Sequence, residues 1–231
     1  QNSDSLLRVW QDESLADTSR LNALDDLTRS YRNSNPDSTI YYGRTLIDFA
    51  AQKGLILYEG KAFGYIGVAY ENLGEFSNSQ KNYSKALEVF TAIKDTGRSY
   101  RMNYNLGWLN WTNGTYDTAK YFFKNAIDLA ISLSDRQKEY KSMNGLAYSY
   151  FQQGHLATAM QIVEKSLKIS LEIDDADGIT WGYNAMGVFY SRKGDNQRAL
   201  EYYLKSLEIR EQGGDSASLA YSLRNVGSTY A

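Results

Sequence analysis

The stretch "GVFYSRKGDNQRALEYYLKSLEI", residues 187–209, decides the fold because its pattern occurs three more times upstream. The earlier copies read "GVAYENLGEFSNSQKNYSKALEV" from residue 67, "GWLNWTNGTYDTAKYFFKNAIDL" from residue 107 and "AYSYFQQGHLATAMQIVEKSLKI" from residue 147. Each copy begins 40 residues after the previous one, so the chain is built on an internal repeat with a 40-residue period.

Several positions keep one kind of residue in every copy. Small residues open the copies at Gly67, Gly107, Ala147, Gly187 and Gly227. A second column consists of Gly74, Gly114, Gly154 and Gly194, and a column of large apolar residues consists of Tyr83, Phe123, Val163 and Tyr203. Apolar residues recur three and four positions apart on both sides of the second glycine, which predicts two helices joined by a short turn. We expect the small residues to let the paired helices approach closely while the large residues fill the gaps beside them.

A small residue, a tyrosine three positions later and a glycine four positions after that, as at Gly67, Tyr70 and Gly74, resemble the tetratricopeptide repeat (TPR) family. The usual unit has about 34 residues. The longer units here lack the helix-ending proline and resemble the branch that includes kinesin light chains and bacterial Rap-type regulators. The resemblance implies an all-α fold, a right-handed α-solenoid of TPR helical hairpins with about five repeats plus the first helix of a sixth.

The period sets the expected organisation of the chain. We assign a cap segment to residues 1–16 and a degenerate first repeat to 17–56, followed by repeats at 57–96, 97–136, 137–176 and 177–216. Residues 217–231 fit the first helix of a truncated sixth repeat, which indicates part of a longer protein; an atypical terminal helix is the alternative. In the degenerate repeat, Asn35-Pro36-Asp37 replaces the turn glycine, and Asp37 or Ser38 is expected to cap the next helix.

Composition and isolated residues argue against several functions. The formal net charge is −2 and no run of Lys or Arg occurs, so we expect no nucleic-acid partner. No apolar run has the length of a membrane span, so no direct membrane contact is expected from this segment. The chain has no cysteine, and its one histidine, His155, lies beside a turn glycine, where we expect an exposed loop position. Because the sequence offers no nucleophile–base pair or metal-ligand cluster, we expect no enzymatic activity, no cofactor and no metal.

The TPR resemblance implies that the first helix of each repeat lines a concave face that holds a protein or peptide partner. Counted from the small-residue column, the groove residues are Lys61, Tyr65, Arg101, Tyr104, Asn105, Trp108, Trp111, Lys141, Asn144, Tyr148, Phe151, Trp181, Asn184 and Asn225. Lys61, Arg101 and Lys141 repeat at the groove edge and resemble part of a carboxylate clamp, with a solvated basic edge as the alternative.

Two kinds of groove residue are informative. Asparagines lie two or three positions before the small column at Asn105, Asn144, Asn184 and Asn225. Asparagine is a mediocre helix former, so these residues either hold the backbone of a partner or bridge adjacent helices. Aromatic residues outside the packing columns predict a stripe of interface anchors at Tyr104, Trp108, Trp111, Tyr148, Phe151 and Trp181.

Three functions fit this pattern. "NSDSLLRVWQDESLADTSRLNALDDL" (2–27) followed by "YRNSNPDSTIYYGRTLIDFA" (31–50) resembles the N-terminal TPR regions of exported Bacteroidetes-type signalling proteins, such as sensor histidine kinases and nucleotide cyclases. That resemblance implies the sensory or regulatory region of a larger protein, in a periplasmic or extracytoplasmic location. A stand-alone cytoplasmic adaptor or Rap-like peptide-responsive regulator is the second hypothesis. Self-assembly into a homodimer through the open sixth repeat is the third.

Overall fold

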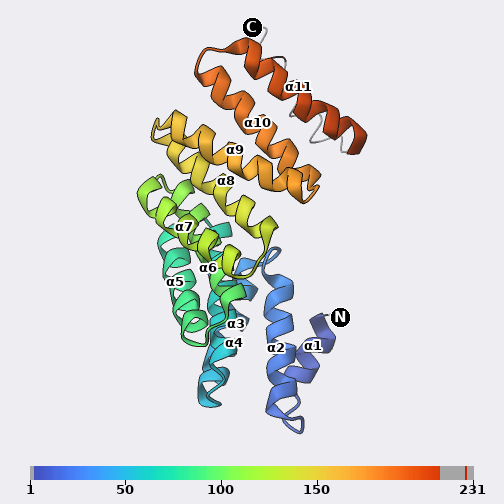
Figure 1. Cartoon of the computed structure of the whole chain (residues 1–231). Coiled ribbons are helices and arrows are strands. Elements are labelled where there is room, and N and C mark those ends of the chain that lie inside the picture. The colour runs from blue at the N-terminus through green and yellow to red at the C-terminus, as the bar shows by residue number, and fades with distance from the viewer. Residues whose placement is uncertain (1–2, 214–226, 228–231) are drawn as a thin grey trace. The chain divides into compact units, whose positions relative to one another are not determined.

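The computed structural model describes residues 3–213 and Gly227, and every regular element in these residues is an α-helix (Figure 1). The predicted all-α fold is therefore confirmed for this part of the chain. The helices are α1 (Ser3–Gln11), α2 (Asp17–Tyr31), α3 (Pro36–Gln52), α4 (Ile56–Asn72), α5 (Phe76–Ala92), α6 (Thr96–Thr112), α7 (Tyr116–Ser132), α8 (Arg136–Gln152), α9 (Leu156–Glu172), α10 (Ala176–Arg192) and α11 (Asn196–Gly213). Among these described helices, none combines the length and the hydrophobicity needed to cross a bilayer.

The helices follow a regular spacing that accounts for the sequence period. From α3 to α10 every helix has 17 residues, and three residues join it to the next helix. Two helices and two connections therefore fill one 40-residue period. The boundaries expected at residues 57, 137 and 177 fall on the second residue of α4, α8 and α10. Of the expected sixth-repeat helix, residues 217–226 and 228–231 lie outside the described residues.

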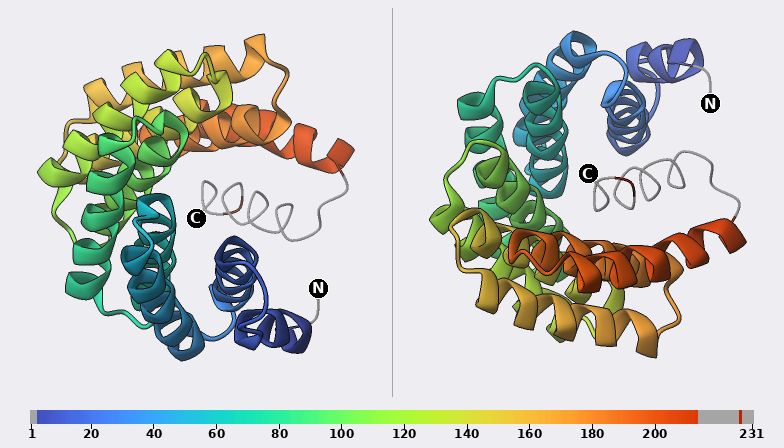
Figure 2. Two further views of the ribbon diagram at one scale, coloured as in Figure 1. Left: turned by 90° about the horizontal axis from the view of Figure 1, so that it is seen from below. Right: turned by 90° about the horizontal axis from the view of Figure 1, so that it is seen from above.

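The chain divides into two compact units, residues 1–113 and 114–231, which we call unit 1 and unit 2. In unit 1 each helix from α1 to α6 packs against the next, and α2 also contacts α4. In unit 2 the same sequential packing runs from α7 to α11. The views in Figure 2 show the paired helices of each unit lying side by side along their lengths. The range 97–136 spans the division, with α6 in unit 1 and α7 in unit 2.

Each three-residue connection has its middle residue in the left-handed region of backbone space. The turns within repeats use the glycine column, with φ from 73° at Gly74 to 83° at Gly194, as glycine has no Cβ to clash there. The connection between the first two repeats also uses a glycine, Gly54 with φ of 66°, whereas the next three reach the same conformation without glycine, with φ of 53–55° at Lys94, Ser134 and Asp174. The glycine turns within repeats are thus confirmed, and three of the connections between repeats use the same geometry with other residues.

The acidic residues between repeats are helix caps. The side chains of Asp95, Asp135 and Asp175 each accept a hydrogen bond from a backbone N–H in the first turn of α6, α8 and α10. In the degenerate first repeat the expected cap was wrong. Asn35, not Asp37 or Ser38, caps α3: its side chain accepts from the Ser38 N–H at 3.0 Å, and Pro36 occupies the first helical position.

Close contact between paired helices depends on the small-residue column, as expected. A Cβ added to Gly67 in α4 would lie 2.5 Å from the ring of Tyr83 in α5, and one added to Gly187 would lie 2.5 Å from Tyr203. The Ser79 hydroxyl also donates to the Gly67 carbonyl at 2.9 Å. In the fourth repeat the small position is Ala147 and the ring is replaced by the smaller Val163, and both are fully buried in one core cluster. A larger residue at the small position is thus matched by a smaller residue on the opposing helix.

Two glycines of α4 should respond in opposite ways to alanine. We expect Gly67→Ala to lower the free energy of unfolding by about 1–3 kcal/mol, because the added methyl overlaps the Tyr83 ring. At Gly64 the added methyl would meet only the Met102 thioether at 3.6 Å, so Gly64→Ala should raise stability by about 0.5–1 kcal/mol through helix propensity. Urea unfolding of both variants measures the two effects. Equal destabilisation by both substitutions would contradict the packing described here.

The Asp135 cap predicts a pH-dependent contribution to stability. Hydrogen bonds from the Lys138 ammonium at 2.5 Å and the Lys138 backbone N–H at 2.9 Å lower the pKa of Asp135. The folded-state pKa lies below the unfolded one, so this stability is fully present above about pH 4 and is lost as pH falls through the folded-state pKa. Asp135→Ala should cost about 0.5–2 kcal/mol at pH 7.

Asp135→Asn is the matched control, because asparagine caps a helix without titrating. The stability difference between the native chain and Asp135→Asn should shrink as the pH falls below about 4. Thermal unfolding of the three proteins at several pH values measures this. A difference that is constant across this pH range would contradict the assignment.

Candidate functional site

One pocket of unit 1 brings together four of the predicted groove residues. It is open to solvent, and its walls come from the end of α2 and from α4, α5 and α6. We call it the basic pocket, and it is lined by Arg32, Lys61, Gly64, Tyr65, Val68, Phe90, Arg101, Met102 and Asn105.

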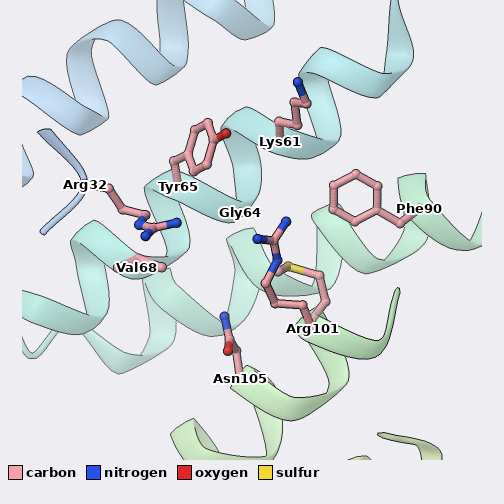
Figure 3. Close-up of a pocket in the computed structure, with 9 residues that line it drawn as sticks. Arg32, Lys61, Gly64, Tyr65, Val68, Phe90, Arg101 and Asn105 are labelled. Carbon is pink, nitrogen blue, oxygen red and sulfur yellow. The ribbon is translucent and has the colours of Figure 1, made fainter. Parts of the chain in front are cut away.

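The basic pocket has an apolar wall and a polar rim. Phe90 and Met102 are buried and supply part of the wall, with Gly64 leaving space above Met102. Figure 3 shows the guanidinium groups of Arg32 and Arg101 and the Asn105 amide directed toward the same space. The pocket therefore presents hydrogen-bond donors around an apolar floor.

One cation of the pocket already has a partner inside the protein. The Lys61 ammonium lies 2.8 Å from a carboxylate oxygen of Asp25, a residue of α2 that is only 6% exposed. Burial raises the pKa of the neighbouring Tyr65 hydroxyl, and the negative charge of Asp25 raises it further. Tyr65 therefore stays protonated and neutral across the physiological pH range.

The two arginines of the pocket lack such a partner. Among residues 3–213, no carboxylate lies within 4.0 Å of the guanidinium of Arg32 or Arg101. The acidic residue nearest to Arg101 in the sequence is Asp95, which directly precedes α6 and forms an ion pair with Arg98. Of the three cations that line the basic pocket, only Lys61 has a carboxylate of the described residues within 4.0 Å.

Half-buried aromatic residues continue along α6 from the pocket. The ring centroids of Tyr104 and Trp108 are 6.2 Å apart and those of Trp108 and Trp111 are 5.6 Å apart, both with edge-to-face geometry. Steps of three and four residues place Arg101, Tyr104 and Trp108 on one side of the helix. We call Tyr104, Trp108 and Trp111 the aromatic ladder; it lies next to the basic pocket along the same helix.

The predicted aromatic residues of unit 2 are part of the packing between α8 and α10. Phe151 stacks on the buried ring of Phe189 at 4.7 Å, and Tyr148 meets Trp181 edge-to-face at 5.2 Å. Phe151 and Trp181 both pack against the core cluster that contains Phe189. Tyr148, Phe151 and Trp181 are half-buried, as is Lys141 on α8. Their role in partner binding stays a prediction.

The asparagines divide into two groups. Asn144 and Asn184 are 6% exposed, and each pairs with a serine of the following helix. The Ser166 hydroxyl donates to the Asn144 side chain, and the Asn184 amide donates to the Ser206 hydroxyl at 2.6 Å. Asn144 and Asn184 therefore bridge adjacent helices, which was the alternative to partner binding in the sequence analysis. Asn105, in contrast, is half-buried in the rim of the basic pocket, and Asn225 lies outside the described residues.

Sequence analysis missed Arg32 and Asp25. Asp25 lies within α2 and Arg32 directly follows it, both in the degenerate first repeat. The sequence columns of the other repeats are shifted by one residue there, so no groove positions were assigned to it. Asp25 carried a usable signal, because it interrupts the apolar face formed by Leu21, Leu24 and Leu27, which are all buried. An acid on such a face needs a cationic partner, and Lys61 supplies it.

The described residues hold no group of three or more His, Asp or Glu side chains that could hold a metal ion. His155 is exposed at the start of α9, as expected for a loop residue.

The Asn184–Ser206 pair should couple energetically. We expect a double-mutant cycle with Asn184→Ala and Ser206→Ala to give an interaction energy of about 0.5–3 kcal/mol, because the hydrogen bond is buried. Gln161→Ala, an exposed position on α9, combined with Ser206→Ala is the control and should be additive. Urea unfolding measures all of these variants. Additivity of the Asn184 and Ser206 substitutions would show that the bridge does not stabilise the fold.

Comparison with known proteins agrees with this architecture. Models described as tetratricopeptide repeat match residues 66–134, 141–173 and 178–231, together about two thirds of the chain. A comparison with curated protein sequences gave no match.

Several solved structures share the fold. The TPR-like repeats attributed to a kinesin light chain of Podosopora anserina are 15% identical, with a TM-score of 0.71 over 87% of this chain and 99% of that one. A Rap protein in complex with competence and sporulation factor is 14% identical, with a TM-score of 0.65 over 93% and 65%. A STAND signal-transduction ATPase with a tetratricopeptide repeat sensor from Pyrococcus horikoshii is 15% identical, with a TM-score of 0.70 over 99% and 39%. Because the tetratricopeptide repeat models match about two thirds of its residues, the chain belongs to the tetratricopeptide repeat family.

Proposed function

We propose that this chain is a non-catalytic scaffold that binds a peptide or protein through the first helices of its repeats. The observation that carries the proposal is the side of α6 that joins the basic pocket to the aromatic ladder. There, Arg101, the Asn105 amide and the half-buried indole rings of Trp108 and Trp111 occur within about three helical turns of α6, and Arg32 lines the same pocket from the end of α2. Such a combination of rigid aromatic anchors and polar donors is typical of protein interfaces.

The packing of the hairpins supports this use of the first helices. The small residues of the first helix face the rings of the second, as Gly67 faces Tyr83, which leaves another side of α4 and α6 for the pocket. The pocket is also built from several consecutive helices. A surface of this kind suits an extended ligand that contacts more than one repeat.

We propose further that the chain is the sensory or regulatory region of a larger bacterial signal-transduction protein. Two similar structures support this: the STAND signal-transduction ATPase has a tetratricopeptide repeat sensor, and the Rap protein was solved in complex with competence and sporulation factor. The N-terminal resemblance to exported Bacteroidetes-type signalling proteins extends the proposal to a periplasmic or extracytoplasmic location. A stand-alone Rap-like regulator is the second candidate, favoured by the same Rap structure.

The coding sequence on both sides of this segment tests the larger-protein proposal. A signal peptide upstream, with a membrane span and a kinase, cyclase or DNA-binding output domain downstream, supports it. A start codon and a stop codon immediately at the ends would support the Rap-like regulator instead. Self-assembly is tested separately by the concentration dependence of the mass in solution.

Peptide binding itself should depend on Trp108. Peptides selected from a random phage-displayed library on the full chain provide the probes, and fluorescence polarisation measures their affinity. We expect Trp108→Ala to weaken binding by about 2 kcal/mol or more, as truncation of an aromatic anchor does. Trp108→Leu keeps apolar volume in case the alanine variant folds poorly.

The control is Tyr121→Ala, which removes a 61% exposed ring on α7, a second helix of a repeat. It should leave the affinity unchanged. Selected peptides that bind equally well to Trp108→Ala, Trp108→Leu and the native chain would contradict the placement of the site on α6.

A further inference from the structure

We propose that the exposed sides of α7 and α9 in unit 2 form the interface of a reversible homodimer. This surface shares no residue with the basic pocket, so the inference is independent of the peptide-binding function proposed above. It also differs from the homodimer expected through the sixth repeat, because residues 217–231 take no part in it.

Large aliphatic residues are exposed at the same end of both helices. Ile131 in the last turn of α7 is 54% exposed, and Leu171 at the equivalent position of α9 is 51% exposed. Leu133 and Ile173 directly follow these helices and are each 37% exposed. Two successive repeats of unit 2 therefore present apolar surface to solvent at matching positions.

Two charged residues precede the apolar end on each helix, and their order is reversed between the helices. α7 carries Lys124 and then Asp128, whereas α9 carries Glu164 and then Lys168 at the equivalent positions. All four side chains are exposed, and none has an oppositely charged group of the described residues within 4.0 Å. Steps of three and four residues place the two charges and the last-turn aliphatic residue on one side of each helix.

The two helices run in the same direction. α7 and α9 both pack against α8, and three-residue connections join the three helices in order (Figure 1). Helices joined by such short connections are antiparallel, so α7 and α9 are both antiparallel to α8. Equivalent residues of α7 and α9 therefore lie at the same level along the helix axes.

A second copy of the chain is the partner that fits this arrangement. A two-fold axis in the interface, parallel to α7 and α9 and midway between them, places α7 of one copy over α9 of the other. Lys124 of one copy then faces Glu164 of the other. Asp128 likewise faces Lys168, and the exposed aliphatic residues meet at the ends of the helices. The surface is thus complementary to itself in charge and in apolar contact.

The equivalent positions of the other second helices lack this combination. At the position of Ile131, α5 carries Thr91 and α11 carries Glu211. At the position of Asp128, both carry a glutamate, Glu88 in α5 and Glu208 in α11. Among these four helices, reversed charges next to an apolar end are confined to α7 and α9, which is why the interface is assigned to this pair.

The size of the surface predicts a weak dimer. Each helix has 17 residues and is therefore about 25 Å long and about 10 Å wide. Two such helices cover about 500 Å² on each copy, or about 1,000 Å² in total, which is at the low end for specific interfaces. Because interfaces of this size are typical of transient association, we expect a monomer–dimer equilibrium at micromolar or higher concentrations.

An exchange of charges tests the arrangement. Sedimentation equilibrium of the full chain, from micromolar to millimolar concentrations, measures the dissociation constant of the dimer. Lys124→Glu opposes two negative charges across the interface, and the contact occurs twice in each dimer. We expect this variant to raise the dissociation constant about tenfold or more.

The matched variant combines Lys124→Glu with Glu164→Lys and has the composition and net charge of the native chain. It restores opposite charges between the two copies, so its dissociation constant should return to within about threefold of the native value. Recovery of this kind also shows that the single variant loses the contact and not the fold.

The apolar end is tested by Leu171→Ser, which should raise the dissociation constant about tenfold. Two controls lie outside the interface. Leu73→Ser removes a leucine that is 46% exposed after α4, and Arg8→Glu makes the same charge change as Lys124→Glu on an exposed residue of α1. Both controls should leave the dissociation constant unchanged.

Three results would overturn the inference. The first is a native chain that stays monomeric up to millimolar concentration. The second is a dimer whose dissociation constant is the same with and without Lys124→Glu. The third is a failure of Glu164→Lys to restore the association that Lys124→Glu weakens. A dimer that depends on residues 217–231 and on none of the α7 and α9 substitutions would place the contact in the sixth repeat instead.

Discussion

The distance between the two helices of each hairpin is the constraint on which the rest of the structure depends. Gly67 lies directly against the Tyr83 ring, and the Ser79 hydroxyl reaches the Gly67 carbonyl, so the helix backbones approach as closely as side chains permit. Where alanine replaces the glycine, at Ala147, the opposing residue shrinks to Val163. Large residues on one helix and small residues on the other satisfy close packing in each hairpin. The other sides of the first helix are then available for neighbouring repeats and for the basic pocket.

The fold was largely predictable because the information that specifies it is local and repeated. The period, the two helices per unit and the glycine turns all follow from residue types at fixed offsets, such as Gly74 between α4 and α5. The connections between repeats were less predictable, since Lys94, Ser134 and Asp174 adopt a left-handed conformation that their sequence does not signal. Asn35 was missed as a cap because asparagine, aspartate and serine stand together there and are all good caps.

The candidate site was only partly predictable, for a geometric reason. Asn144 and Asn184 stand one position earlier in the repeat than Asn105, and one residue corresponds to a rotation of about 100° around the helix. That rotation turns their amides toward serines of the second helix, whereas Asn105 reaches the basic pocket. Sequence periodicity shows which side of a helix a residue lies on, but it does not separate residues at the centre of that side from residues at its edge. Arg32 could not be predicted from the sequence, because it belongs to the degenerate repeat and lines the pocket from the end of α2.

The pocket takes its lining from the end of α2 and from α4, α5 and α6, so three successive repeats contribute to it. In a solenoid each repeat contacts only its neighbours, so successive repeats are joined by one interface at a time. A ligand in the basic pocket would contact three repeats at once and would oppose changes in the spacing between them. Occupancy would then change the elastic stiffness of this part of the array.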